Sequence, residues 1–478
     1  MMPAPEDIYK NDVDFTTLAL QYPDFAKRLK SNRQLDFSDP ESVRQLTKAL
    51  LHRDFDLSID LPDDRLCPPV PNRFNYILFI QRLLDTTAPD FHDGYDPDRQ
   101  VIGLDIGTGS SAIYPLLSCR QRPKWLFLAT EIDDTNRNYA SKNIAANHLQ
   151  SRIKLIDTDM SGQQLIPSTE LERFDRLDIL MTNPPFYESE ASMLASARSK
   201  SRPANSSCTG APIEMIVPGG EVSFVSRLIL ESALPKNRSR IQWFSAMLGK
   251  LSSVGSIVDK LREKGCTNFA VTEFIQGQKT RRWCVAWSWL GLRPSMAVSR
   301  GVVGSSGVEK KYLPAPTEME YDMPMTSMDG LSVAEKRVNE EIGKLLGAGA
   351  GVLWKYVHAR RAGMLMSKEG DVWSRKARRK KLHHHDHQHH QAEDVDQEMK
   401  DHSVEQEDAE DAEGEGSNDE DELDKEPALV VRIELSTPSS EYGSSSNQAK
   451  TRIRIRHLQG HDRVLFESFC GWLKRKVS

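Results

Sequence analysis

The sequence lacks the features that mark membrane, secreted and disulfide-rich proteins. It has no run of about 18 apolar residues, so it predicts no membrane span. The acidic N-terminus lacks the apolar core of a secretory signal. Cysteine is scarce in 478 residues, and no Cys-x-x-Cys pair occurs among Cys67, Cys119, Cys208, Cys266, Cys284 and Cys470. This spacing indicates reduced structural thiols in an intracellular protein, with no disulfide framework and no metal site.

Charge is distributed unevenly along the chain. The formal net charge is −6, but the segment from Glu393 to Glu426 holds 18 Asp and Glu against two Lys, a local charge of −16. The rest of the chain therefore carries +10. A basic body is compatible with a nucleic-acid partner, and a solvated surface with a solubilising acidic segment explains the same numbers equally well.

From Val101 onward, apolar strand-like runs alternate with helical stretches. Strands are predicted at 101–105, 125–130, 152–156, 177–182, 240–248, 268–275 and 282–289, and helices at 135–147, 220–234 and 251–264. This alternation is typical of an α/β fold with a mostly parallel sheet covered by helices on both faces. The residues between the last two strands are too few for a helical crossover, so the final strand is predicted to be antiparallel.

Composition divides the chain into five parts. The prediction is a helical N-terminal extension at 1–72, the α/β domain at 73–290, a Pro-, Gly- and Ser-rich linker at 291–331, a small α+β domain formed by 332–381 with 428–478, and a disordered His-rich and acidic insertion at 382–427. In the N-terminal part, Asp39 is predicted to cap a helix that has Pro40 in its first turn.

The first chemical motif follows the first strand. Asp105, Gly107 and Gly109 stand where that strand turns into a helix, and Glu131 follows the second strand. Glycines permit a sharp turn and a close approach of a ligand to backbone amides, at the sheet edge where ligands bind. A carboxylate such as Glu131 can accept both ribose hydroxyls. The pattern lacks the third glycine of a dinucleotide site, so it suits S-adenosylmethionine better than NAD, although a plain strand–helix turn is the alternative.

The second motif is Asn183-Pro184-Pro185-Phe186, at the end of the fourth strand. The two prolines stiffen the loop. The Asn183 side-chain oxygen and the Pro184 carbonyl can accept both hydrogens of one planar amine, while Phe186 stacks on the ring that carries it. Such a site methylates by positioning and electrostatics, without a strong base. By itself the motif leaves open adenine in DNA, adenine in RNA, a protein glutamine amide, or an ordinary proline turn.

Much of residues 13–290 resembles the RNA adenine-N6 methyltransferases of the methyltransferase-like protein 16 / ribosomal RNA large-subunit methyltransferase F family. The matching stretches are YPDF (22–25), LSIDLP (57–62), PVPNRFNYI (69–77), GLDIGTGSSAIYPLL (103–117), FLATEIDD (127–134), NPPF (183–186), GGEVSFV (219–225), WFSAMLGK (243–250) and TEFIQGQKTRRWCVAWS (272–288). A fungal-type eukaryotic member is expected. The resemblance implies a class I, Rossmann-like methyltransferase fold, S-adenosylmethionine as cofactor, and N6-methyladenosine in structured RNA as product.

The resemblance also assigns site residues. The cofactor site would comprise Arg73, Asp105, Gly107, Thr108, Gly109, Ser111, Glu131 and Asn183, and the residues Asn183, Pro184, Pro185 and Phe186 would hold the target adenine. Residues 187–218 are predicted to form a mobile substrate loop. Basic residues there and between the last two strands are candidates for RNA contact, unless they are simply solvated: Arg198, Lys200, Arg202, Lys279, Arg281 and Arg282.

The C-terminal part loosely resembles the RNA-binding domain of eukaryotic family members. Alternation in RIRIRHL predicts that Arg452, Arg454 and Arg456 share one strand face, which either follows RNA phosphates or protects an edge strand by its charge. The basic run 375–381 suggests a nuclear import signal or a phosphate-binding arm, and the expected location is the nucleus, with the cytoplasm as the alternative. Eukaryotic members of the family act on U6 small nuclear RNA and on hairpins. The expected partner is therefore structured RNA, and the rival activities are methylation of ribosomal RNA adenine or of a protein glutamine; an RNA-binding scaffold with an inactive pocket is the non-enzymatic alternative.

Overall fold

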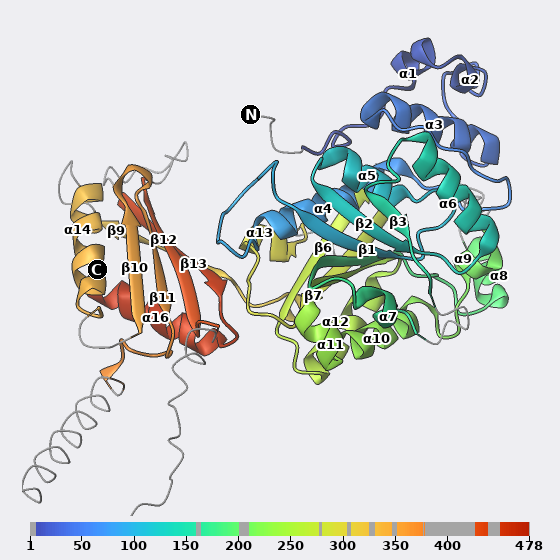
Figure 1. Cartoon of the computed structure of the whole chain (residues 1–478). Helices are drawn as coiled ribbons and strands as arrows, with labels where there is room; N and C mark the ends of the chain where they lie inside the picture. The colour runs from blue at the N-terminus through green and yellow to red at the C-terminus, as the bar shows by residue number, and fades with distance from the viewer. Residues whose placement is uncertain are drawn as a thin grey trace, which may run out of the picture. The chain divides into compact units, whose positions relative to one another are not determined.

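The computed structural model describes residues 6–158, 164–199, 210–276, 280–303, 307–324, 330–346, 351–375, 377, 426–437 and 450–477. The chain divides into two compact units, Met1–Ala315 and Pro316–Ser478 (Figure 1). No helix among the described residues is both long and apolar enough to span a membrane.

Unit 1 is built on an eight-stranded sheet with the strand order β3-β2-β1-β4-β5-β7-β6-β8. The strands are β1 (Val101–Ile106), β2 (Trp125–Thr130), β3 (Ile153–Leu155), β4 (Leu177–Thr182), β5 (Ile241–Leu248), β6 (Asn268–Gln276), β7 (Thr280–Ser288) and β8 (Arg300–Gly301). The pairs among β1 to β5 are parallel, whereas β7 runs antiparallel to both β5 and β6. The predicted α/β class and the antiparallel last long strand are therefore confirmed.

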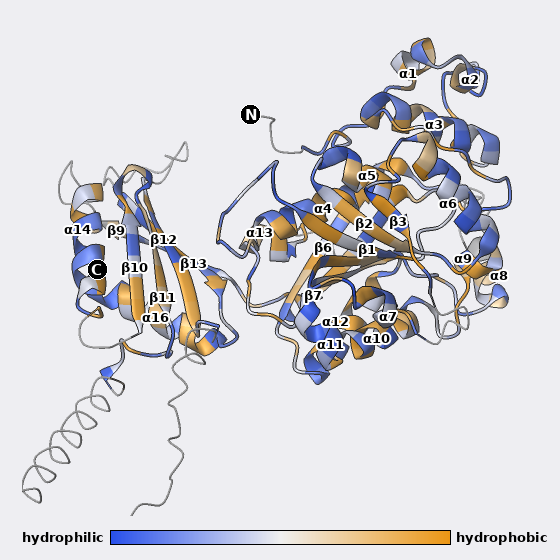
Figure 2. Cartoon of the chain, viewed as in Figure 1, coloured by the Kyte–Doolittle hydropathy of each residue, from blue (hydrophilic) through white to orange (hydrophobic). Residues whose placement is uncertain are grey.

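Helices cover both faces of this sheet, and apolar residues concentrate in the strands between them (Figures 1 and 2). The helices are α1 (Phe15–Gln21), α2 (Pro23–Ala26), α3 (Pro40–Phe55), α4 (Val70–Asp85), α5 (Ile113–Gln121), α6 (Asp134–Ala146), α7 (Ser168–Leu171), α8 (Glu190–Ser199), α9 (Pro212–Met215), α10 (Gly220–Ser232), α11 (Pro235–Arg240), α12 (Leu251–Glu263) and α13 (Met296–Ser299), with the 3-10 turn η1 at Lys310–Tyr312. One buried cluster joins α3, α4, α5 and α6 to the sheet, and a second joins α10 and α12 to it.

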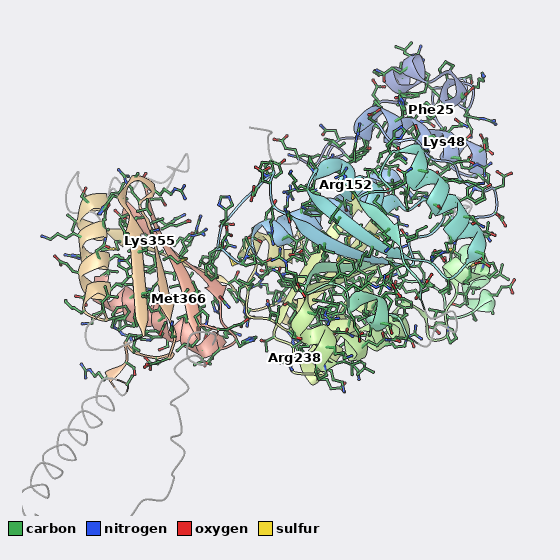
Figure 3. The ribbon with its side chains drawn as sticks, viewed as in Figure 1. Phe25, Lys48, Arg152, Arg238, Lys355 and Met366 are labelled. Atoms are coloured by element: carbon green, nitrogen blue, oxygen red, sulfur yellow. The ribbon has the colours of Figure 1, made fainter. Side chains whose placement is uncertain are left out.

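The N-terminal helices belong to the core of unit 1. The predicted cap of α3 is confirmed, because the Asp39 carboxylate accepts the Ser42 N–H at 3.0 Å and Pro40 occupies the first turn. Phe25 of α2 is buried, and Lys48 of α3 lies nearby in Figure 3, 3.6 Å from the Asp60 carboxylate. The long helix α4 carries an almost continuous apolar run into the core, which fixes the position of Arg73 in its first turn.

Unit 2 is a five-stranded antiparallel sheet with the order β10-β11-β12-β13-β9. Its elements are β9 (Glu318–Pro324), α14 (Gly330–Gly343), β10 (Val352–Val357), η2 (His358–Arg360), β11 (Ala362–Ser367), β12 (Leu429–Ser436), β13 (Lys450–Gln459) and α16 (Arg463–Val477). Side chains of α14 and α16 and of the inner sheet face form one apolar cluster. The α+β character predicted for this part is confirmed.

Two predicted segments differ from the structure. Residues 291–331 are not only a linker, because α13 and β8 belong to unit 1 and β9 pairs with β13 in unit 2. In β9, Met319, Tyr321 and Met323 pack on the core of unit 2, a period-two pattern hidden by the surrounding prolines and serines. Residues 187–218 are also more than a loop, since they contain α8 and α9.

Candidate active site

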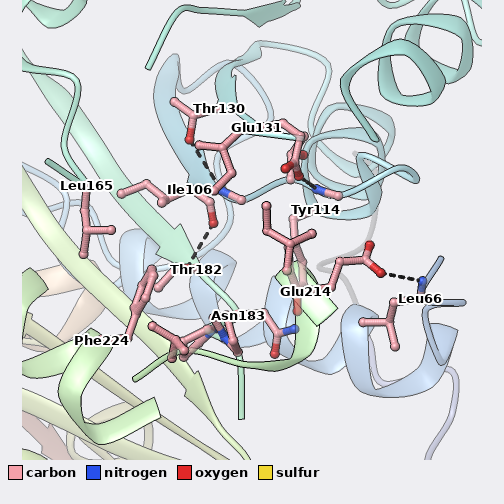
Figure 4. Close-up of a pocket in the computed structure, with 18 of the residues that line it drawn as sticks. Leu66, Ile106, Tyr114, Thr130, Glu131, Leu165, Thr182, Asn183, Glu214 and Phe224 are labelled. Carbon is pink, nitrogen blue, oxygen red and sulfur yellow. Dashed lines mark hydrogen bonds between the residues drawn. The ribbon is translucent and has the colours of Figure 1, made fainter. Parts of the chain in front are cut away.

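A cavity of about 410 Å³ lies at the carboxyl ends of β1, β2 and β4 (Figure 4). This is where parallel α/β sheets place their ligands. Its walls come from the turn after β1, the end of β2, the loop after β4 and the segment around α9. The lining residues include Arg73, Gly107, Thr108, Gly109, Ser111, Glu131, Asn183, Pro184 and Pro185. Nine of the sequence-predicted site residues are therefore brought together around one cavity.

The turn after β1 has a backbone that only glycine adopts easily. Gly107 and Gly109 have φ of +73° and +66°, and a Cβ at either position would meet no other atom within 4 Å. Conformation rather than crowding is thus the reason for glycine here. The Gly109 N–H donates to Glu131 Oε2 at 2.8 Å, and the Asp133 N–H donates to Glu131 Oε1 at 3.0 Å. Glu131 therefore joins the turns after β1 and β2 at the cavity wall.

Two carboxyl groups at this edge are buried. Burial raises the pKa of Glu131, and it raises the pKa of Asp105 to about 7, with the charge of Glu131 acting in the same direction. Asp105 lies beneath the turn rather than on the cavity surface, and a hydrogen bond from the Thr108 side chain partly opposes the rise of its pKa. The lining hydroxyl of Ser110 has no hydrogen-bond partner among the described residues. A buried polar group without a partner fits a polar ligand such as S-adenosylmethionine.

The loop after β4 is held by groups from distant parts of the chain. Arg73 Nη1 donates to Asn183 Oδ1 at 3.4 Å and lies 3.1 Å from Met247 Sδ, and the guanidinium is 5.6 Å from the Tyr114 ring centroid. Arg73 is only 6% exposed, so its charge is directed at the cavity and not at bulk solvent. This placement suits a cationic partner for a ligand carboxylate.

Phe186 is placed differently from the rest of its motif. It does not line the cavity; its ring packs against Gly249 at the end of β5, and the Arg282 guanidinium lies 5.9 Å from its centroid. Arg281 pairs with Glu273 at 2.7 Å. Of the other predicted RNA contacts, Arg198 belongs to α8, and Lys200, Arg202 and Lys279 lie outside the described residues.

Several lining residues were missed by the sequence analysis. Glu214 of α9 accepts the backbone N–H groups of Leu66 and Ala211, both at 2.9 Å, and the Asn136 amide at 3.2 Å. Burial raises the pKa of Glu214. Phe224 of α10 also lines the cavity (Figure 4). The proline at the start of α9 with glutamate two residues later signals a helix start, but no sequence signal places that helix at this cavity.

The fold, the glycine turn and the Asn-Pro-Pro loop at one sheet edge define a class I S-adenosylmethionine-dependent methyltransferase. A family model described as RNA methyltransferase matches residues 4–291, so the chain belongs to the RNA methyltransferase family. The predictions of an RNA methyltransferase, of its class I fold and of S-adenosylmethionine as cofactor are confirmed.

Relatives named as RNA adenine methyltransferases match about three fifths of the chain. The U6 small nuclear RNA (adenine-(43)-N(6))-methyltransferase of Schizosaccharomyces pombe is 41% identical over 291 residues, which cover 60% of this chain and 70% of that protein. The human RNA N(6)-adenosine-methyltransferase METTL16 is 41% identical over 282 residues, covering 58% of this chain and 48% of that protein.

A solved structure shows the same likeness. The crystal structure of the human METTL16 catalytic domain in complex with MAT2A 3'UTR hairpin 6 superposes with a TM-score of 0.51 at 39% identity, covering 59% of this chain and 96% of that one. Unit 2 begins beyond the residues that the family model matches.

Proposed function

We propose that the protein transfers a methyl group to the N6 amine of an adenosine in structured RNA, with U6 small nuclear RNA as the substrate. The observation that carries this proposal is the Asn183-Pro184-Pro185 loop at the wall of the cavity that the glycine turn opens. The named activities of the fission yeast and human relatives support the same reaction and the same class of substrate. A U6 substrate implies a nuclear site of action.

In this proposal, different residues of the cavity bind different parts of the cofactor. Bound S-adenosylmethionine supplies an electrophilic methyl group on a sulfonium. In this proposal Glu131 accepts its ribose hydroxyls, Arg73 pairs with its carboxylate, and the turn from Gly107 to Gly109 approaches it with backbone alone; that all of them line one cavity supports these roles. The hydroxyls of Thr108 and Ser111 complete the polar wall.

Asn183 positions the nucleophile. The N6 lone pair of adenine is delocalised into the ring, so the amine must be drawn towards a tetrahedral shape before it can attack. A carbonyl oxygen has two lone pairs, so Asn183 Oδ1 can hold the Arg73 guanidinium with one and accept an amine hydrogen with the other. The Pro184 carbonyl is the second acceptor. The amine becomes acidic as it gains positive charge, so solvent can take its proton and no strong base is required.

Labelled-methyl transfer to in vitro transcribed U6 RNA tests the proposal. The wild type should label the RNA, and Asn183→Ala should label it about 10²–10³-fold more slowly, the usual loss for one preorganised transition-state contact. Asn138→Ala, an exposed position in α6, is the matched control and should keep wild-type activity. Equal labelling by wild type and Asn183→Ala would refute the assignment of the site.

The rival substrates are separated by the same assay. A glutamine methyltransferase would label a protein Gln and ignore RNA, because its amide offers the same planar amine to Asn183 and Pro184. A ribosomal RNA enzyme would label large-subunit RNA in preference to U6. Either pattern would replace the U6 substrate while leaving the roles of the cavity residues intact.

A further inference from the structure

The Phe186 ring packs directly against the backbone of Gly249. A Cβ built on Gly249 would lie 2.8 Å from Phe186 Cδ1, closer than real Cβ atoms come, and 3.1 Å from Cε1, so the ring occupies the space that the Cβ of another residue would need. The contact on the side of α10 is ordinary, because a Cβ on Gly220 would lie 3.4 Å from the Phe186 carbonyl oxygen. The position of the ring is therefore limited by one glycine, Gly249.

Gly249 is in turn held by one buried carboxylate, Glu221 in the first turn of α10. Glu221 Oε2 accepts the Gly249 N–H at 2.7 Å. Its Oε1 accepts the Lys250 N–H at 3.1 Å and the Ser253 hydroxyl at 2.5 Å. Only 2% of Glu221 is exposed. Charge-assisted bonds from three donors at this burial fix the turn between β5 and α12.

Helix capping alone does not account for this arrangement. Lys250 is the N-cap of α12, and a carboxylate near a helix start satisfies free N–H groups there. The shortest hydrogen bond that the Glu221 carboxylate accepts from the backbone, however, comes from Gly249. This residue precedes the N-cap, and the Phe186 ring packs against it. The carboxylate therefore reaches beyond the helix cap to the residue against which the Phe186 ring packs.

We propose that Glu221 and Gly249 form a seat that sets the position of Phe186 for stacking on the target adenine. This inference rests on the proposed function, because it needs a purine at the Asn183 loop. Glu221 touches neither cofactor nor adenine in this scheme; both residues act through the ring. A shift of the ring by a fraction of an ångström would misalign the adenine and its N6 amine relative to Asn183.

The test compares Gly249→Ala and Glu221→Gln with wild type in full-length protein. We expect both to lower kcat for U6 RNA by about 10- to 100-fold, the range that a misplaced substrate costs. Affinity for S-adenosylhomocysteine, measured by calorimetry, should stay within about twofold, since the ring lies outside the cavity. Ser256→Ala is the matched control: it changes an exposed serine of the same helix α12 that does not contact Glu221, and should keep kcat within about threefold.

A double-mutant cycle distinguishes positioning from folding. In a Phe186→Ala background, neither Gly249→Ala nor Glu221→Gln should lower kcat further, because the ring through which they act is gone. Losses that multiply in the double variants would overturn the seat, and so would a full kcat in Glu221→Gln. If Gly249→Ala does not fold, the Glu221→Gln cycle gives the same decision. An inactive wild type would overturn the proposed function and the seat together, whereas an active wild type with multiplying losses would overturn the seat alone.

Discussion

Replacing Asp105 with asparagine should stabilise the ligand-free protein at pH 8. The gain in stability over wild type should be much smaller at pH 5. Asp105 is fully buried at the end of β1, and the effect of burial on its pKa outweighs the opposing hydrogen bond from the Thr108 side chain. Burial raises its pKa from 3.8 to about 7. The folded state thus holds a proton on this group over a pH range in which the unfolded chain has released it.

The sign and size follow from this difference. A group whose pKa is raised by folding stabilises the protein fully below the unfolded value, near pH 4, and the contribution is lost as pH rises through about 7. Each pKa unit is worth about 1.4 kcal/mol, so the loss by pH 8 is about 4 kcal/mol. Asparagine has a similar shape and no charge to bury, so the variant escapes this loss.

Thermal unfolding of wild type and Asp105→Asn between pH 5 and pH 8 measures the effect. At pH 8 the variant should melt on the order of 5–10 °C higher, and the difference should shrink steadily towards pH 5. Asp259→Asn, an exposed carboxyl on α12, is the matched control and should show no such pH-dependent gap. A gap that is the same at both pH values, or a variant less stable at pH 8, would refute the reasoning.

Four further outcomes are expected. Arg73→Lys should weaken S-adenosylhomocysteine binding about 10- to 100-fold by calorimetry, because a compact ammonium lacks the planar fork that reaches Asn183 and a ligand carboxylate together. Glu214→Gln should speed cofactor release about tenfold in stopped-flow measurements, since it weakens the bonds that hold α9 over the cavity. Arg454→Ala should leave RNA affinity within about twofold, because Arg454 already pairs with Glu320 at 2.6 Å. RNA affinity of the wild type should fall with salt, and a flat titration would remove the electrostatic argument from the +10 body.

The sheet of unit 1 could be predicted because its strands are buried apolar runs with clear ends. All seven predicted strands lie within two residues of the observed ones. The short strand β8 was missed for a different reason. β8 has two residues, and its place is fixed by pairing with Val271 and Thr272 of β6 rather than by its own composition.

The site was predictable only where the chemistry lies within one motif. The glycine turn and the Asn-Pro-Pro loop each contain their functional groups in a few consecutive residues. Glu214 and Phe224 line the same cavity without belonging to a local pattern that reveals it. Their position depends on how α9 and α10 return to the sheet edge, which is a property of tertiary packing.

The arginine face of β13 shows that a local pattern can be predicted correctly while its partners in the sheet are not. Alternation correctly predicted which side chains share a face, but not what stands opposite them. Arg452 pairs with Asp322 at 2.8 Å and Arg454 with Glu320 at 2.6 Å, both across the β13–β9 ladder. Arg456 is 5% exposed, and burial lowers its pKa to about 10. The sequence of β13 alone suggests a row of arginines that could bind RNA phosphates. In the sheet, Arg452 and Arg454 are already paired with carboxylates of β9.

The Asn-Pro-Pro-Phe motif therefore carries less information than its specificity suggests. Asn183 is oriented by Arg73, which lies 110 residues earlier, and Phe186 rests on Gly249, which Glu221 holds. In the proposed mechanism the motif supplies the acceptors and the aromatic ring, while their relative positions come from α4, β5 and α10. A protein could keep all four motif residues and lose the reaction through a change at Glu221 or Gly249, because catalysis by positioning depends on the supports as much as on the groups positioned.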